Sequence, residues 1–338
     1  ESAIKLFESI SGWKDADEIF ACKKKIEELK AQAEADAKEL NHLKAVTAYK
    51  GMEDVVVEKL TASNVDAFIR PFDLAKAPLL RAGYIENTVV IDMHHIIADG
   101  SSSAILFKEL NELYMGRELK EAVQYGEFAV TDTYTKADEE YWINEYEEVP
   151  VLELVTDYEK QDTLSSKGTN VLTLIDNELN ESILNKCSSL GITPYAYYMA
   201  CYNIFLTKYS GNEDICVGVP SSGRSSKYLD TIGMFVNMLS VRNQPEGQKT
   251  FKTFVKEIKD KTIEAISHQN YPQNELIKKI NHKKTLYDVM FVYQSEEMTE
   301  IVFGDKRAEA VPMCGNTAKC ALSFYVLPRK TETVLSVE

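Results

Sequence analysis

The sequence has no excess of basic residues, no long apolar run and no export signal. Its 38 Lys and Arg are outnumbered by 53 Asp and Glu, which gives a formal net charge of −15, whereas nucleic acids and anionic membranes attract a basic face. We therefore expect neither as a partner, and expect small molecules or proteins instead. No apolar stretch approaches the roughly 20 residues of a spanning helix, and the opening ESAIKLFESISG lacks a basic segment followed by an apolar one. These absences predict a cytoplasmic protein.

Paired cysteines are also absent. No CxxC pair of the kind that nucleates a zinc site occurs, so we expect no metal. Because a buried cysteine usually behaves as a small hydrophobe, we predict buried free thiols in a reducing compartment. The six are Cys22, Cys187, Cys201, Cys216, Cys314 and Cys320.

The amino-terminal 45 residues differ from the rest of the chain in composition and in the spacing of their apolar residues. Ile4, Phe7 and Ile10 recur at helical spacing, Ser11 and Gly12 interrupt the pattern, and KKKIEELKAQAEADAKEL then supplies strong helix formers. The pattern predicts a helical hairpin, weakly similar to a tetratricopeptide repeat, with a solvated linker as the alternative. The segment lacks the alternating β-branched residues of a strand, so we expect it to lie outside the main fold.

From about residue 50 the chain alternates strand and helix signals, typical of an α/β protein. Residues 79–84 predict a strand, 86–87 a turn and 89–93 a buried strand that delivers His94 and His95. A loop over 96–100 follows, and any of the serines at 101–103 can cap the next helix, which continues to residue 114. Strand, loop and helix start therefore converge on the histidine pair, and we expect a functional site there.

The histidine pair suggests proton transfer. Neighbouring strand residues point to opposite faces, so we expect one histidine to be catalytic and the other structural. An imidazole with an ordinary pKa of about 6.5 can accept a proton from an attacking amine at neutral pH. Asp99 can pair with an arginine to fix the loop, and Gly100 permits an unusual backbone turn. Read alone, the pair is also compatible with core histidines or an incidental metal site.

The motif HHIIADG at 94–100 resembles the HHxxxDG signature of the condensation domains of nonribosomal peptide synthetases, within the chloramphenicol acetyltransferase-like superfamily. Further blocks resemble that family in the same order. They are RPFDLAKAPLLRAGY at 70–84, QYGEFAV at 124–130, YWINEYEEVPVLELVTDY at 141–158, GNEDICVGVPSSGR at 211–224, IGMFVNMLSVR at 232–242, HQNYPQNELI at 268–277 and LYDVMFVYQ at 286–294. Among these, 232–242 reads by itself as an interior strand, and His268 as a turn or interface residue.

The resemblance implies an α/β fold of two lobes with mixed sheets and a tunnel between them. Donor and acceptor peptidyl carrier proteins would extend phosphopantetheine arms into the tunnel, with no intrinsically bound cofactor and an adenylation domain next to it. His95 is then the central catalytic residue, with His94, Asp99 and Gly100 in the same motif. Ser101 and Asn237 are candidates for substrate binding, and Arg224 is the candidate ionic partner that holds Asp99. The implied activity is amide bond formation between thioesters in antibiotic biosynthesis.

The sequence departs from the family pattern at several places. The SxxQ and RHExLRTxF segments that precede the motif in the family are missing, and Thr131 stands where tryptophan is usual. In TAKCALSF at 317–324, Ala321 stands where aspartate is frequent. We therefore expect an incomplete amino-terminal lobe over 46–150, after the hairpin of 1–45, and a carboxy-terminal lobe over 151–338 that is truncated at its end.

Other functions on the same scaffold stay open. An epimerisation domain would carry the same motif, but usually with an aromatic residue shortly after it, where this chain has SSSAIL. A coenzyme A-dependent acyltransferase is a second alternative, and a non-catalytic docking platform for carrier proteins is a third. The presence of both His95 and Asp99 favours an enzyme over the platform.

Overall fold

The computed structural model describes residues 56–61, 65–129, 134–157, 167–282, 285–294, 301–308, 318–329 and 332–338. The hairpin predicted for 1–45 lies outside these residues, as does Thr131. The chain divides after Ile97 into two compact units, and we describe each by itself. The boundaries that we predicted after residues 45 and 150 stay predictions.

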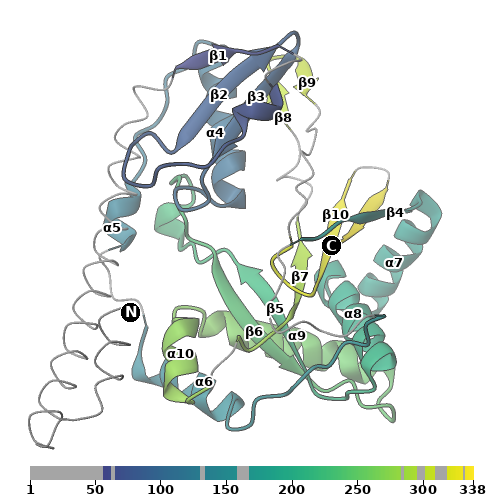
Figure 1. The fold of residues 1–338 in the computed structure, drawn as a ribbon. Helices are drawn as coiled ribbons and strands as arrows, with labels where there is room; N and C mark the ends of the chain where they lie inside the picture. The colour runs from purple at the N-terminus through teal and green to yellow at the C-terminus, as the bar shows by residue number, and fades with distance from the viewer. Residues whose placement is uncertain are drawn as a thin grey trace, which may run out of the picture. The chain divides into compact units, whose positions relative to one another are not determined.

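The first unit is built on a three-stranded sheet of order β1-β2-β3 (Figure 1). Strand β1 (Val57–Lys59) pairs in parallel with β2 (Leu80–Ile85), which forms an antiparallel hairpin with β3 (Thr88–Met93). A short helix, α3 (Val65–Phe68), precedes β2. The buried apolar side chains of this unit include Leu60, Phe68 and Leu79. Both strands that the sequence predicted before the histidines are therefore present.

The burial predicted for the strand before the histidines is wrong. No residue of β3 is fully buried, and Val89 is 63% exposed. The strand pairs antiparallel with β2 at an edge of the described sheet, and an antiparallel sheet can leave one of its faces to water. The strand also ends at Met93, one residue before the histidines.

The second unit contains a six-stranded mixed sheet of order β4-β11-β10-β7-β5-β6. Strand β7 pairs in parallel with both β10 and β5, while the other neighbours are antiparallel. The strands are β4 (Val171–Ile175), β5 (Ile215–Ser221), β6 (Asn237–Asn243), β7 (Val289–Tyr293), β10 (Leu322–Pro328) and β11 (Thr333–Val337). A separate hairpin joins β8 (Ile301–Phe303) to β9 (Lys306–Ala308).

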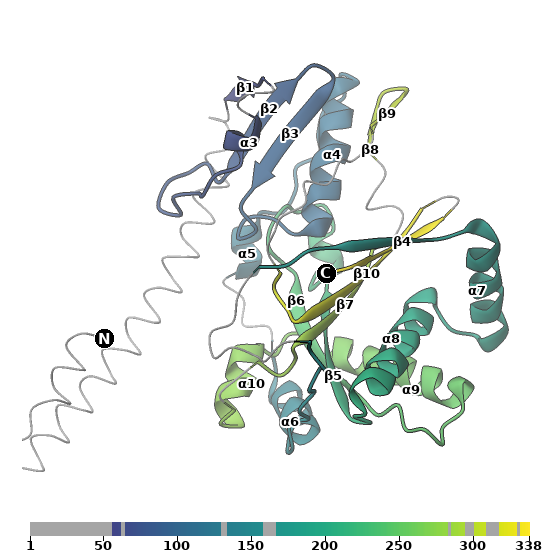
Figure 2. The same cartoon turned by 45° about the vertical axis from the view of Figure 1, so that its right-hand side comes forward.

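Seven α-helices accompany the described strands of this unit. They are α4 (Gly100–Tyr114), α5 (Tyr125–Ala129), α6 (Lys136–Glu145), α7 (Asn177–Leu190), α8 (Pro194–Ser210), α9 (Phe251–Ser267) and α10 (Gln273–Lys279), with a 3₁₀ turn, η2, at Ser226–Tyr228. Helices α8 and α9 pack on each other and on the large sheet (Figure 2). Tyr202 of α8 stacks on Phe291 and Phe324 of β7 and β10. The hydrophobic core therefore lies between these two helices and the sheet.

The segment 232–242 is only in part the strand that we predicted. Strand β6 begins at Asn237, and residues 232–236 form a loop. The backbone N–H groups of Gly233 and Phe235 donate to the side chains of Ser102 and Asp99, at 3.0 and 3.1 Å, instead of to a neighbouring strand. These side-chain acceptors replace the ladder of a sheet, so the first half of the segment is held against helix α4.

The cysteine prediction is correct for two of the described thiols. Cys187 and Cys216 are buried, but Cys320 is half-buried and Cys201 is exposed. All four are free thiols, and Cys22 and Cys314 lie outside the described residues. Among the described residues, no cluster of His, Cys, Asp and Glu could hold a metal ion, and no helix is long and apolar enough to cross a bilayer.

Candidate functional site

The two histidines follow β3 directly and differ in their surroundings. His94 is half-buried, its backbone N–H donates to the carbonyl of Leu79 at 3.0 Å, and its Nδ1 accepts from the backbone N–H of Ile96 at 3.1 Å. Its ring lies edge-on to Phe72, with 6.0 Å between the ring centroids. Since Nδ1 accepts a hydrogen bond, the neutral ring carries its proton on Nε2. The contacts of His94 therefore shape the turn.

His95 occupies the turn itself, over residues 95–97, and its side chain is exposed. The sequence argument assumed that strand alternation places the two rings on opposite faces. The strand has already ended at Met93, so this alternation does not apply to them. The hydrogen bond at Nδ1 of His94 and the exposure of His95 separate them instead.

Asp99 caps helix α4, which corrects our expectation that one of the serines at 101–103 does so. The carboxylate Oδ1 of Asp99 accepts from the backbone N–H of Ser102 at 2.8 Å, and its backbone is extended, as an N-cap requires. Asp and Ser are comparable caps, so local preference does not decide between them. The carboxylate is favoured here because it has a buried cationic partner.

That partner is Arg224, which forms with Asp99 a nearly inaccessible ion pair in the second unit. Nη2 of Arg224 lies 2.8 Å from Oδ1 of Asp99, and the two side chains are 4% and 0% exposed. Nη1 donates to the carbonyls of Tyr228 and Thr231 at 3.0 and 2.5 Å. The guanidinium also lies over the ring of Phe235, 4.2 Å from its centroid. The pair that the sequence suggested is thus present, although its role in catalysis stays a prediction.

Ser102 is a member of this cluster that the sequence analysis missed. Its hydroxyl is within 2.8 Å of both Oδ1 of Asp99 and the carbonyl of Gly233, and it accepts from Nη2 of Arg224 at 2.9 Å. A hydroxyl has a single proton, so it donates to one of these two oxygens at a time. The serine was in view as a helix cap, but its distant partners at 224 and 233 give no local signal.

Tyr125, in the QYGEFAV block, closes the cluster from helix α5. Its hydroxyl donates to the carbonyl of Met234 at 2.9 Å, and its ring meets Phe235 edge-on, with 5.0 Å between the ring centroids. Burial raises the pKa of the Tyr125 hydroxyl, and the nearby charge of Asp99 raises it further. The hydroxyl therefore stays protonated and keeps its donor role at neutral pH.

Gly223 allows the close approach that brings Arg224 to the loop. Its φ is +61°, and a Cβ added to it would lie 2.1 Å from the carbonyl oxygen of Phe235. A backbone atom cannot yield as a flexible side chain can. The residue before Arg224 must therefore be glycine for both conformational and steric reasons.

We expect Gly223→Ala to lower the free energy of unfolding by about 2–4 kcal/mol, since the left-handed backbone and the steric overlap each cost about 1–2 kcal/mol or more. The control is Gly116→Ala, where φ is +71° but nothing lies within 4 Å of the added Cβ. Urea unfolding of both variants separates the two costs. Equal losses in the two variants would show that the contact with Phe235 is unimportant.

The other predicted residues of the motif have plainer positions. Gly100 is the first residue of helix α4 and is not among the described glycines with positive φ, so our prediction of an unusual turn there is wrong. The helix cap at Asp99 already changes the chain direction, which leaves an ordinary helical conformation for Gly100. Ser101 is half-buried in the first turn of the same helix.

Asn237 contacts the protein itself. Its side-chain N–H donates to the backbone carbonyl of Gln269, and Ser221, its cross-strand neighbour, donates to the side chain of Gln269 at 2.5 Å. The loop at 268–272 is thus anchored to the ends of β5 and β6. This contact accounts for the partner that a half-buried amide needs, whereas a contact with substrate stays a prediction.

His268 joins two helices, in agreement with the turn or interface role predicted for it. Nδ1 of His268 lies 2.7 Å from Oδ1 of Asp138, which also forms the capping box of helix α6 with Thr135. Burial alone would raise the pKa of Asp138, but hydrogen bonds from Thr135 and His268 outweigh it and lower the pKa. Tyr141 stacks on the imidazole, with 4.3 Å between the ring centroids. His268 is therefore a structural residue at the end of helix α9.

A family model described as "Condensation domain" matches residues 39–338. Curated relatives include gramicidin S synthase 2 of Brevibacillus brevis, 42% identical over 275 residues and 75% of this chain, and tyrocidine synthase 2 of Brevibacillus parabrevis, 35% identical over 313 residues and 85% of this chain. The matched part is 6% and 9% of those two proteins, so the chain spans a small part of their length.

Solved structures agree on the fold. The condensation domain of the monacolin K polyketide synthase MokA matches with a TM-score of 0.69 and 18% identity, over 83% of this chain and 72% of that one. The first condensation domain of the calcium-dependent antibiotic synthetase matches with a TM-score of 0.65 and 18% identity, over 79% of this chain and 63% of that one. The chain belongs to the condensation domain family, and is homologous to peptide synthetases. The predicted family and its mixed α/β fold are confirmed.

Proposed function

We propose that this chain forms amide bonds between two substrates held as thioesters, with His95 as the catalytic residue. The observation that carries the proposal is the buried pair of Asp99 and Arg224. It fixes Asp99, which caps helix α4 and lies four residues after His95 in the chain, and so would hold the motif in one geometry. Preorganisation of this kind is what a catalytic group on a turn requires. Gly100, in the first turn of α4, belongs to the same fixed segment.

In the proposed reaction, the acceptor amine attacks the carbonyl carbon of the donor thioester. The new C–N bond forms, the C–S bond breaks, and the donor's carrier leaves as a thiol. His95 would accept a proton from the attacking nitrogen and return it to the departing sulfur, so the reaction needs no other reactant. Holding both tethered reactants together supplies much of the rate, because effective concentrations in such arrangements are high. His94 would shape the turn, while Ser101 and Asn237 would contact substrate.

The partners that this function requires are a donor and an acceptor carrier protein, each with a phosphopantetheine arm, and an adenylation domain that loads them. Membership of the family supports these partners, since its relatives are peptide synthetases. The acidic net charge is compatible with a cytoplasmic enzyme that binds neither nucleic acid nor membrane.

The test is a coupling assay in the natural polypeptide that carries this chain, with one carrier loaded with a donor amino acid and the other with an acceptor. We expect a dipeptidyl thioester on the acceptor carrier, detected by intact-protein mass spectrometry. Transfer of the α-hydrogen into solvent without coupling would indicate an epimerisation domain, and acyl transfer from free coenzyme A would indicate the acyltransferase alternative. Carrier binding without any reaction would leave only the docking platform.

A further inference from the structure

We infer that Arg81 is a positioning residue for the proposed reaction, because its guanidinium holds Phe72 against the ring of His94 and so fixes the turn that carries His95. The inference rests on the proposed function and goes beyond it, since it assigns a role to a residue outside the histidine motif. Arg81 lies on β2, and Phe72 lies in the segment between α3 and β2. Both belong to the first unit, as do the two histidines.

The guanidinium of Arg81 joins the hairpin of β2 and β3 to the segment that precedes it. Arg81 and Asp92 are direct cross-strand neighbours, and Nη1 of Arg81 lies 2.6 Å from Oδ2 of Asp92. The same group also reaches the preceding segment, where Nη1 donates to the carbonyl of Arg70 at 2.7 Å and Nη2 to that of Pro71 at 3.0 Å. These two carbonyls come immediately before Phe72 in the chain. One side chain therefore holds the backbone from which the Phe72 ring projects.

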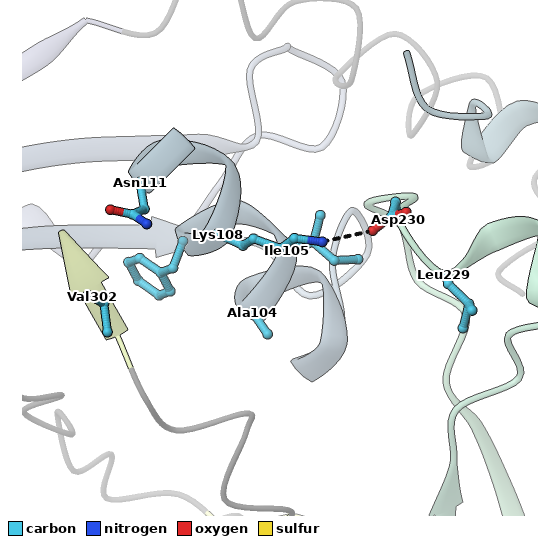
Figure 3. A pocket seen from close by; sticks show the side chains of 8 residues that line it. Ala104, Ile105, Lys108, Asn111, Leu229, Asp230 and Val302 are labelled. Carbon is cyan, nitrogen blue, oxygen red and sulfur yellow. Dashed lines mark hydrogen bonds and ion pairs between the residues drawn. The ribbon is translucent and has the colours of Figure 1, made fainter. Parts of the chain in front are cut away.

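Low exposure distinguishes this ion pair from pairs at the surface. The side chains of Arg81 and Asp92 are 13% and 17% exposed. By contrast, Lys108 and Asp230, which Figure 3 shows beside a pocket, lie 3.3 Å apart with side chains that are 67% and 71% exposed. A pair that is open to solvent contributes little, whereas the loss of one member of a largely buried pair leaves the other charge poorly solvated. The pair with Asp92 therefore keeps the Arg81 guanidinium in place.

Phe72 contacts both the guanidinium and the imidazole. Cζ of Arg81 lies 3.6 Å from the centroid of the Phe72 ring, which is a cation–π contact. The same ring meets His94 edge-on, with 6.0 Å between the ring centroids. A planar guanidinium can lie over a ring and donate to several carbonyls at the same time, whereas the ammonium of lysine is a single point charge. Arginine is therefore the side chain that this arrangement requires.

The orientation of the His94 ring then affects the position of His95. Nδ1 of His94 accepts from the backbone N–H of Ile96, so the ring spans the backbone of His95, which lies between these two residues in the chain. A rotation of the ring would release this N–H and free the turn. A shift of about 1 Å in a reacting group can lower a rate by about 10²-fold. Arg81 therefore acts on the rate through Phe72 and His94.

The experiment is single-turnover coupling in the natural polypeptide that carries this chain, with both carriers preloaded and at a temperature well below the melting point of every variant. We expect Arg81→Met to lower the rate constant by about 10-fold. Arg81→Lys keeps the charge but not the planar fork, so it should lose nearly as much, whereas a purely structural ion pair would be rescued by lysine. The control is Arg70→Met, which removes an arginine whose pair with Glu58 is exposed and should keep the wild-type rate.

A double-mutant cycle with His94→Ala tests the path of the effect. In the His94→Ala background, Arg81→Met should lower the rate by less than about 2-fold, because the ring that Arg81 positions is gone. Phe72→Leu should behave like Arg81→Met in both backgrounds, and it replaces that variant in the cycle should Arg81→Met not fold. Phe72→Tyr keeps the aromatic ring and should retain the rate.

Three results would overturn the inference while coupling by the wild type upheld the proposed function. They are a wild-type rate in folded Arg81→Met, rescue of the rate by lysine, and an equal loss with and without the His94 ring. Absence of coupling in the wild type would overturn both.

Discussion

Replacement of His95 by alanine is expected to lower the rate of dipeptidyl-thioester formation by at least ~10²-fold, the usual loss when a general base or positioning group is removed. The side chain is exposed on a turn, so its removal leaves no cavity in the core. The loss should therefore be in kcat, with the melting temperature close to that of the wild type. Single-turnover coupling with preloaded carriers measures the step directly.

The matched control is His94→Ala, because it removes the same side chain from the neighbouring position. His94 accepts the N–H of Ile96 and packs its ring against Phe72, so its loss should lower the melting temperature as well as the rate. A folded His95→Ala variant with near wild-type turnover would remove His95 from the mechanism. A large effect of His94→Ala on turnover, at unchanged melting temperature, would transfer the catalytic role to His94.

The sequence predicted the elements around the motif because their signals are local. Apolar runs over 79–84 and 89–93, with a turn between, are enough to define a hairpin, and Glu86 in the left-handed region closes it as a turn residue does. The order of the blocks added the resemblance to a family, and the family model over residues 39–338 confirms that family. Local pattern and block order together were sufficient for the fold class.

The sequence could not predict the contacts that Ser102 and Tyr125 make with the loop at 231–235. Ser102 and Tyr125 owe their importance to partners near residues 231–235, more than 100 positions away, and nothing in their own neighbourhood marks them. The loop at 232–236 was mistaken for a strand because its apolar residues alternate. Its amides are in fact bonded to Asp99 and Ser102. Long-range polar contacts of this kind leave no periodic trace in the sequence.

The second large effect is expected from the pair of Asp99 and Arg224. Removing one member of a buried ion pair costs about 3–5 kcal/mol, because the remaining charge stays in an environment that water cannot reach. Asp99→Asn keeps the shape of the side chain and its place at the helix start, but leaves the guanidinium, only 4% exposed, without its counter-charge. Arg224→Met leaves the carboxylate with Ser102 and Phe235 as donors. Each single variant should lower both stability and coupling activity.

The double variant Asp99→Asn with Arg224→Met separates charge from packing. It retains neither charge of the pair. Its loss of unfolding free energy, measured by guanidinium chloride titration, should therefore be smaller than the sum of the losses in the two single variants. Coupling should nevertheless stay low, because the start of α4 loses the ion pair through which Arg224 ties it to the carbonyls of Tyr228 and Thr231. The control is Lys227→Met, which breaks the exposed pair with Glu127 and should leave the unfolding midpoint unchanged. Single variants as stable as this control would show that Asp99 and Arg224 do not act as a buried pair, and full activity in the double variant would show that the pair does not hold the motif.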